Sequence, residues 1–95
     1  MKRILEIVKG YAVPTPDLQL IDLKSYTVLP GFIDMHVHLE QETGKNKYMN
    51  KFTQNPEDKA FESVVYAERT LMAGFTTVRD LGGSGVNISL RTAIN

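Results

Sequence analysis

The sequence predicts an α/β fold organised around a strand–helix–strand unit, and three features predict it. Residues 30–39 alternate apolar and polar side chains with the period of a strand, an amphipathic helix pattern follows Asn55, and residues 75–81 are rich in β-branched side chains. A strand, a helix and a second strand in this order predict a right-handed parallel βαβ crossover.

The first 29 residues precede this unit and have a different pattern. Residues 3–8 and 18–23 are short apolar runs typical of strands, and two prolines, Pro14 and Pro16, predict a rigid turn between them. We therefore expect a pair of small strands before a new start at residue 30.

The strand expected at residues 30–39 carries both histidines of the chain, His36 and His38. Side chains at positions i and i+2 leave the same face of a strand about 6.6 Å apart, so both imidazoles can converge on one metal ion. Asp34 lies one step deeper on that face, either as a partner that supports the ligands or as a ligand itself. On geometry alone, the alternative is a solvent-facing edge strand with two inert histidines.

Residues 40–54 form a polar segment without a clear period. The segment is long for a plain connection, and it begins at the carboxyl end of a strand, where α/β folds place their active sites. It either bears on substrate choice or is a solvated connector.

The predicted helix begins and ends with strong local signals. Asn55 is a good N-cap, Pro56 suits the first helical position, and Gly74 supplies the C-terminal stop. We expect one apolar face of this helix to be buried against the flanking strands. The residues of that face are Phe61, Val64, Val65, Leu71 and Met72.

The strand expected at residues 75–81 ends at a glycine-rich stretch, 82–85, and a second helix begins near residue 87. The glycines suggest a phosphate cradle, but the spacing of a P-loop or a dinucleotide fingerprint is missing, so we predict a turn. Asp80 ends its strand at the same rim as the histidines if the strands are parallel neighbours, and it would then shape the site. Alternatively, its carboxylate pairs with Arg79 or caps the turn.

Composition excludes several classes of function. The 11 basic and 11 acidic residues cancel, so no electrostatic field favours nucleic acid or an anionic membrane. Cysteine is absent, which leaves His, Asp and Glu as metal ligands. No signal peptide or apolar stretch of about 20 residues is present, so we expect a soluble chain in the cytoplasm, with the periplasm or secretion as alternatives.

Two blocks of sequence resemble a known enzyme family. Residues 30–39, PGFIDMHVHL, resemble the His-x-His signature of the amidohydrolase superfamily of metal-dependent hydrolases. Residues 67–83, AERTLMAGFTTVRDLGG, are similar to the region from helix 1 to strand 2 in the branch of imidazolonepropionase-like enzymes and Xaa-Pro dipeptidases. The segment between the blocks is most similar to the Xaa-Pro dipeptidase group, and the resemblance covers residues 18–95.

The resemblance implies a fold and a metal site. The fold is the start of a (β/α)₈ TIM barrel, with residues 1–29 as the end of a small flanking β-sandwich and residues 30–95 as the first two βα units. His36 and His38 match ligands of a divalent ion, usually zinc, in a site of one or two ions. Asp34 matches a residue that supports the structure of the motif.

The resemblance also implies hydrolysis of a peptide or cyclic-amide C–N bond by metal-activated water. The remaining ligands and the catalytic aspartate would lie beyond residue 95, so we expect no catalytic residue within this chain. We predict that the chain is the amino-terminal fragment of a larger enzyme and that, alone, it is neither stably folded nor active. For the full-length enzyme, a homo-oligomer is one of the assemblies that we consider. Its partners would be a small peptide or amide substrate and the rest of its own barrel. The alternative is a non-catalytic remnant or a metal-binding or interaction module.

Overall fold

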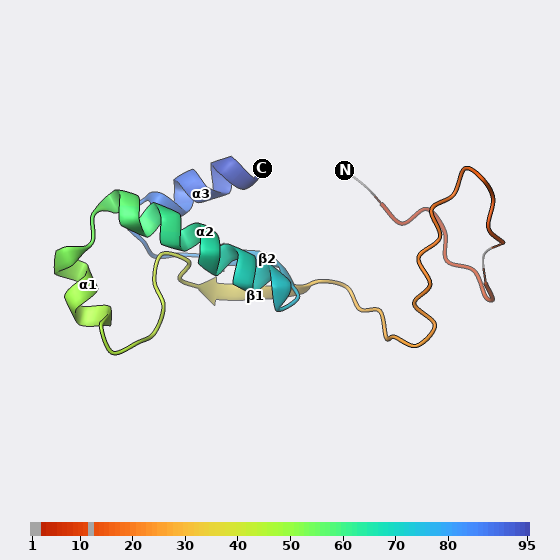
Figure 1. Cartoon of the computed structure of the whole chain (residues 1–95), viewed down its shortest axis with the longest axis horizontal. Coiled ribbons are helices and arrows are strands. Elements are labelled where there is room, and N and C mark those ends of the chain that lie inside the picture. Colours follow the sequence, from red (N-terminus) through yellow and green to blue (C-terminus); the bar gives the residue numbers. More distant parts are fainter. Residues whose placement is uncertain (1–2, 12) are drawn as a thin grey trace.

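The computed structural model describes residues 3–11 and 13–95, and it contains two strands and three helices in these ranges (Figure 1). In chain order the elements are β1 (Phe32–Val37), α1 (Lys47–Thr53), α2 (Pro56–Met72), β2 (Phe75–Asp80) and α3 (Val86–Ile94). The predicted order of strand, helix and strand is confirmed.

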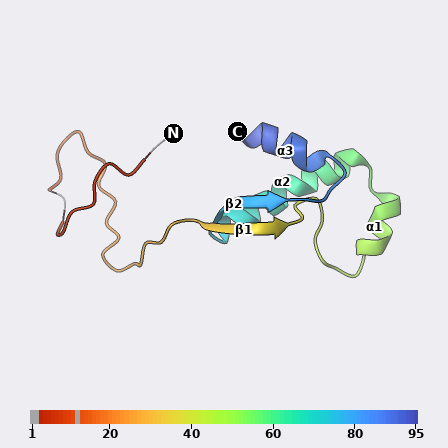
Figure 2. The ribbon, with the colours of Figure 1, turned by 180° about the vertical axis from the view of Figure 1, so that it is seen from behind.

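The two strands form a parallel pair, and both arrows point the same way in Figure 2. Phe32 is opposite Phe75 at the start of the pair, where the ring centroids lie 5.7 Å apart, and Val37 is opposite Asp80 at the end. The backbone N–H of Phe32 also donates to the carbonyl of Gly74 over 2.8 Å. Because the pairing is parallel, the carboxyl ends of β1 and β2 meet at one edge.

Helix α2 begins and ends where its sequence signals place it. The backbone N–H of Asn55 donates to Oδ2 of Asp58 over 2.9 Å, and Pro56 occupies the first turn, where its missing N–H costs nothing. At the other end Gly74 takes a φ of +97°, which L side chains rarely adopt, and the chain turns into β2.

The expected burial of the apolar face of α2 is wrong in the described residues. Phe61 is 76% exposed and Met72 is 80% exposed, and Val64, Val65 and Leu71 also face solvent. Two strands form a sheet that is too narrow to cover a helix of this length. Burial is instead concentrated at Ser63, at Glu40 and at Leu90, and α3 packs against α2.

The polar segment 40–54 contains a helix that sequence reasoning missed. In α1 the rings of Tyr48 and Phe52 lie 5.2 Å apart, at the i, i+4 spacing that places side chains on one helix face. This spacing was the available signal for α1. Helix α3 begins within one residue of its predicted start, after Gly85 with a φ of +105°.

Residues 3–8 and 18–23 were predicted as strands, and this is wrong: among the described residues before β1 there is no strand. Isolated turns occur instead, in which Leu18 N–H donates to the Thr15 carbonyl and Tyr26 N–H to the Leu23 carbonyl. An extended segment becomes a strand only when a neighbour accepts its backbone hydrogen bonds.

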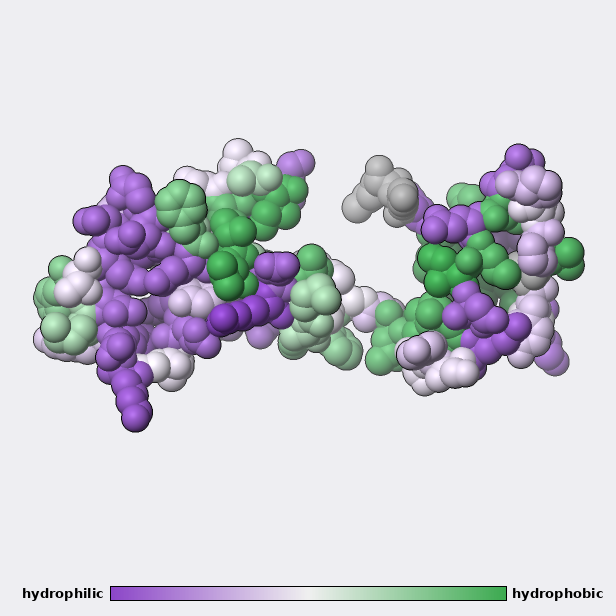
Figure 3. Space-filling view, viewed as in Figure 1, coloured by the Kyte–Doolittle hydropathy of each residue, from purple (hydrophilic) through white to green (hydrophobic). Residues whose placement is uncertain are grey.

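The segment before β1 therefore projects from the βαβ unit as an arm. Its apolar side chains gather apart from the rest of the chain (Figure 3). The radius of gyration is 18.7 Å, against about 12 Å for a compact domain of this length. The flanking β-sandwich stays a prediction. None of the described helices is both long enough and apolar enough to cross a lipid bilayer.

We expect Gly74→Ala to lower the free energy of unfolding by about 1–2 kcal/mol, because a Cβ is strained at a positive φ. This Cβ would also lie 3.3 Å from Cδ2 of Phe32, at the start of the strand pair. The matched control is Gly44→Ala, where no atom lies within 4 Å of the added carbon and φ is not positive. Thermal unfolding of both variants checks the prediction, and equal midpoints would contradict it.

Candidate metal centre

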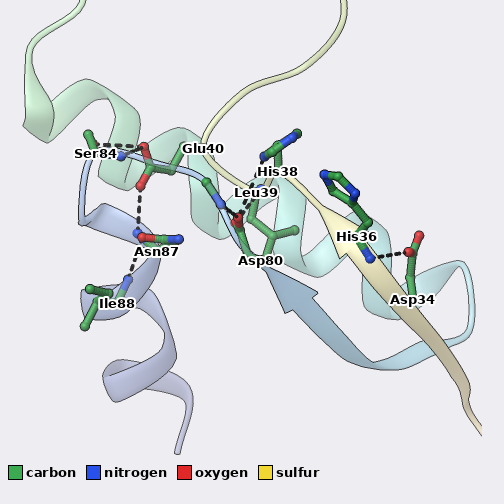
Figure 4. A network of polar contacts seen from close by, with 10 residues as sticks. Asp34, His36, His38, Leu39, Glu40, Asp80, Ser84, Asn87 and Ile88 are labelled. Atoms are coloured by element: carbon green, nitrogen blue, oxygen red, sulfur yellow. Dashed lines mark hydrogen bonds and ion pairs between the residues drawn. The ribbon is translucent and has the colours of Figure 1, made fainter.

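The two histidines lie together at the carboxyl end of β1. The ring centroids of His36 and His38 are 5.2 Å apart, and the ring planes are at 79° (Figure 4). Both residues are exposed, so both rings are open to an incoming ion. The two rings are therefore close neighbours, as the i, i+2 spacing predicts, and their convergence on one ion stays a prediction.

Asp34 supports the strand and does not contact either imidazole ring. Its Oδ1 accepts a hydrogen bond of 2.9 Å from the backbone N–H of His36. The contact lies in the stretch where the register of β1 against β2 is irregular, between Asp34 and Val37. Asp34 therefore fixes the backbone beneath the first histidine.

Asp80 closes the site from the end of β2, and only 9% of its side chain is exposed. Its Oδ2 accepts the N–H of Leu39 over 3.0 Å, and its Oδ1 accepts the N–H of Gly82 over 3.1 Å. The same Oδ1 lies 3.8 Å from Nδ1 of His38. Asp80 thus caps the turn after β2, as one of the predicted alternatives has it. Its carboxylate also lies near the imidazole of His38.

Sequence reasoning missed Glu40, which is 7% exposed although it is the third residue after the end of β1 and the second after His38. Its Oε2 accepts hydrogen bonds from the backbone N–H of Ser84 over 2.7 Å and from the Ser84 hydroxyl over 2.9 Å. Its Oε1 accepts the N–H of Asn87 over 2.9 Å. These contacts join the end of β1 to the start of α3.

The ionised form of Glu40 is favoured by this arrangement. Burial alone would raise the pKa of the Glu40 carboxyl, but the hydrogen bonds from Ser84 and Asn87 and the nearby Lys59 together hold that pKa below its ordinary value. No pattern in the sequence marks this carboxylate, since its partners are 44 and 47 residues away.

The glycines after β2 allow the close approach of this loop to the site. A Cβ on Gly82 would lie 3.0 Å from Cε1 of His38, and a Cβ on Gly83 would lie 2.5 Å from Oε1 of Glu40. The loop is therefore a turn, as predicted, with a carboxylate of this chain in the position that a phosphate would take.

A cleft of about 560 Å³ opens beside His38, between the segment 40–54 and α2. Its lining includes four lysines, Lys45, Lys47, Lys51 and Lys59. Three carboxylates also line it, and each has a partner: Glu40 as above, Glu62 with Gln54 and Tyr66, and Glu42 with Arg69. In residues 3–11 and 13–95 none of the four lysines forms an ion pair.

The donor set fits a divalent ion in part. Two neutral imidazoles on one face are ligands that zinc and similar ions accept. Within the described ranges, however, no group of three or more His, Cys, Asp or Glu side chains is placed to hold a metal ion. The two histidines would be two of the three or more protein ligands that a catalytic site needs, and their role as ligands stays a prediction.

Comparison with known proteins identifies the family. A model described as "Amidohydrolase family" matches residues 27–95, which include every helix and strand of the described residues. The chain belongs to the amidohydrolase family. Dihydroorotases from two strains of Staphylococcus epidermidis are 37% identical to it over 46 residues, which is 48% of this chain and 11% of each relative.

The match confirms the superfamily and leaves its narrower branch open. Amidohydrolases generally use divalent metal ions, which agrees with paired histidines at a strand end. The similar relatives are dihydroorotases, so the likeness to imidazolonepropionase-like enzymes and Xaa-Pro dipeptidases stays a prediction. The matched residues cover about a tenth of the length of these relatives.

We expect Asp80→Ala to lower the free energy of unfolding by about 1–3 kcal/mol, because the N–H groups of Leu39 and Gly82 lose their acceptor. Hydrogen exchange should be faster at both amides. Asp17→Ala, at an exposed position in the arm, is the control. Unchanged hydrogen exchange at the amides of Leu39 and Gly82 would show that Asp80 does not protect them.

Proposed function

We propose that this amidohydrolase chain is the amino-terminal part of a metal-dependent hydrolase that cleaves an amide C–N bond. The observation that carries the proposal is the pair His36 and His38 at the carboxyl end of a strand, beside a cleft, in a chain of this family. Carboxyl ends of parallel strands are where α/β folds place their chemistry.

The exposed apolar surface supports the view that more protein covers this unit. Large apolar side chains of α2 and β1, such as Phe61, Val65 and Met35, are exposed in the structure. In a (β/α)₈ barrel further strands and helices would cover them. The remaining barrel is therefore the first partner that we propose for this chain.

His36 and His38 would hold a divalent cation, with zinc as the first choice for imidazole ligands. Bound there, such an ion would lower the pKa of a water molecule and polarise the scissile carbonyl. Within this chain, Asp34 and Asp80 hold the backbone on either side of the histidines and so keep the rings in place. In this proposal the carboxylate that takes the proton of the attacking water comes from the rest of the enzyme.

The cleft beside His38 favours a substrate that carries a carboxylate. Its own carboxylates have hydrogen-bond or ion-pair partners, whereas the ammonium groups of Lys45, Lys47, Lys51 and Lys59 form no ion pair in the described part of the chain. Dipeptides with a free carboxyl terminus and dihydroorotate both carry such a group. The likeness to Xaa-Pro dipeptidases favours the first substrate, and the similar dihydroorotases favour the second.

We expect the double variant His36→Ala, His38→Ala of the full-length enzyme to retain less than about a tenth of its zinc and to lose turnover, because both imidazole ligands are removed. Zinc content is measured by atomic absorption, and turnover with an Xaa-Pro dipeptide and with dihydroorotate. Gln19→Ala, exposed in the arm, is the control. Unchanged turnover in the double variant would reject the proposed metal site, and the preferred substrate decides between peptide and cyclic amide.

We expect the double variant Lys51→Gln, Lys59→Gln to raise KM for the carboxylate-bearing substrate about threefold or more, with little change in kcat, because two positive charges that line the cleft are lost. An uncharged analogue, such as the dipeptide amide, should show no such change. Lys9→Gln serves as the control, because it removes a lysine of the arm that does not line the cleft. An equal rise in KM for the amide would show that these lysines do not recognise the carboxylate.

A further inference from the structure

The loop after β2 and the first turn of α3 form a ring of hydrogen-bond donors around one carboxylate. The backbone N–H groups of Ser84 and Asn87 and the hydroxyl of Ser84 all point at Glu40 (Figure 4). Loops of this kind at a helix N-terminus commonly bind anions. Here the anion belongs to the protein, and it is buried.

The position of Glu40 in the chain connects these hydrogen-bond donors to the two histidines. Glu40 lies two residues after His38, and the residue between them, Leu39, donates its N–H to Asp80. Two consecutive residues after the second histidine are thus tied to the β2 side of the site. The end of β1 has little freedom to move relative to the loop.

The loop after β2 in turn lies directly against the imidazole ring of His38. Gly82 is so near that a Cβ there would lie 3.0 Å from Cε1 of the imidazole. Oδ1 of Asp80, which caps Gly82, lies 3.8 Å from Nδ1, and Figure 4 shows the other ring nitrogen pointing away from Asp80. A shift of the loop would therefore change the direction in which that nitrogen points.

We propose that Glu40 is a positioning residue for the metal site: by binding Ser84 and Asn87 it holds Gly82 and Asp80 against His38, so that Nε2 of His38 faces the cation. The inference rests on the proposed function, in which His36 and His38 hold a divalent ion. Both carboxylate oxygens of Glu40 are engaged by Ser84 and Asn87. Glu40 acts through the loop after β2 and through the imidazole ring of His38.

The chemistry of the contact makes Glu40→Gln a sharp test. Both carboxylate oxygens accept hydrogen bonds, Oε1 from Asn87 and Oε2 from Ser84. A glutamine has the same size but one acceptor oxygen, so its NH₂ group must face one of the two backbone N–H donors. The loop then loses its hold although the volume is kept.

The experiment measures zinc affinity by chelator competition and the visible spectrum of the Co²⁺-loaded enzyme, both on the full-length protein. We expect Glu40→Gln to weaken zinc binding about tenfold or more, the range found when groups that orient metal ligands are removed. Its Co²⁺ spectrum should shift, and Ser84→Ala should have a smaller effect in the same direction, because one of three bonds is lost. Glu68→Gln, exposed on α2, is the matched control and should match the wild type.

Each outcome decides a different claim. Wild-type zinc affinity and an unshifted Co²⁺ spectrum in Glu40→Gln would overturn the positioning role and leave the metal site in place. A wild-type enzyme that binds neither Zn²⁺ nor Co²⁺ would overturn the proposed function and this inference with it. If Glu40→Gln does not fold, the folded Ser84→Ala variant decides: wild-type affinity and spectrum overturn the role, and the intermediate change supports it.

Discussion

The parallel pairing of β1 and β2 is the constraint on which the rest of the structure depends. An antiparallel pair would place the end of one strand beside the start of the other and would separate His38 from Asp80 by the length of a strand. Parallel pairing places Val37 opposite Asp80, so that the segments after both strands leave the sheet at one edge. The histidines, Asp80, the glycine loop and the cleft are neighbours for this reason.

At this edge of the sheet, carboxylates accept hydrogen bonds from backbone N–H groups. Asp34, Asp80 and Glu40 each accept backbone N–H groups, and together they tie the histidine strand to itself, to β2 and to α3. Charge-assisted hydrogen bonds of this kind are stronger than neutral ones. They matter more here than in a domain with a large core, because Leu90 is the one apolar residue that is buried among the described residues.

The elements that local chemistry specifies were the ones that the sequence predicted well. The start of α2 depends on Asn55, Pro56 and Asp58, and its end on Gly74, all of which are readable within a few residues. The spacing of His36 and His38 likewise fixes which face of a strand they share. Two predictions that needed a partner were wrong: residues 18–23 form no strand, and Phe61 and Met72 are not buried. Strand formation and burial both depend on a neighbour that a local pattern cannot supply.

Glu40 marks the boundary between what the sequence alone determines and what the tertiary structure decides. The sequence by itself determined the order of β1, α2 and β2, the limits of α2, the pair of histidines and the superfamily that the family match confirmed. Nothing local distinguishes Glu40 from Glu42 two residues later, yet the first is buried against Ser84 and Asn87 and the second is an exposed partner of Arg69. Only the crossover that places residue 84 beside residue 40 decides between them, because hydrogen bonds across more than 40 residues depend on the path of the chain and not on its local pattern.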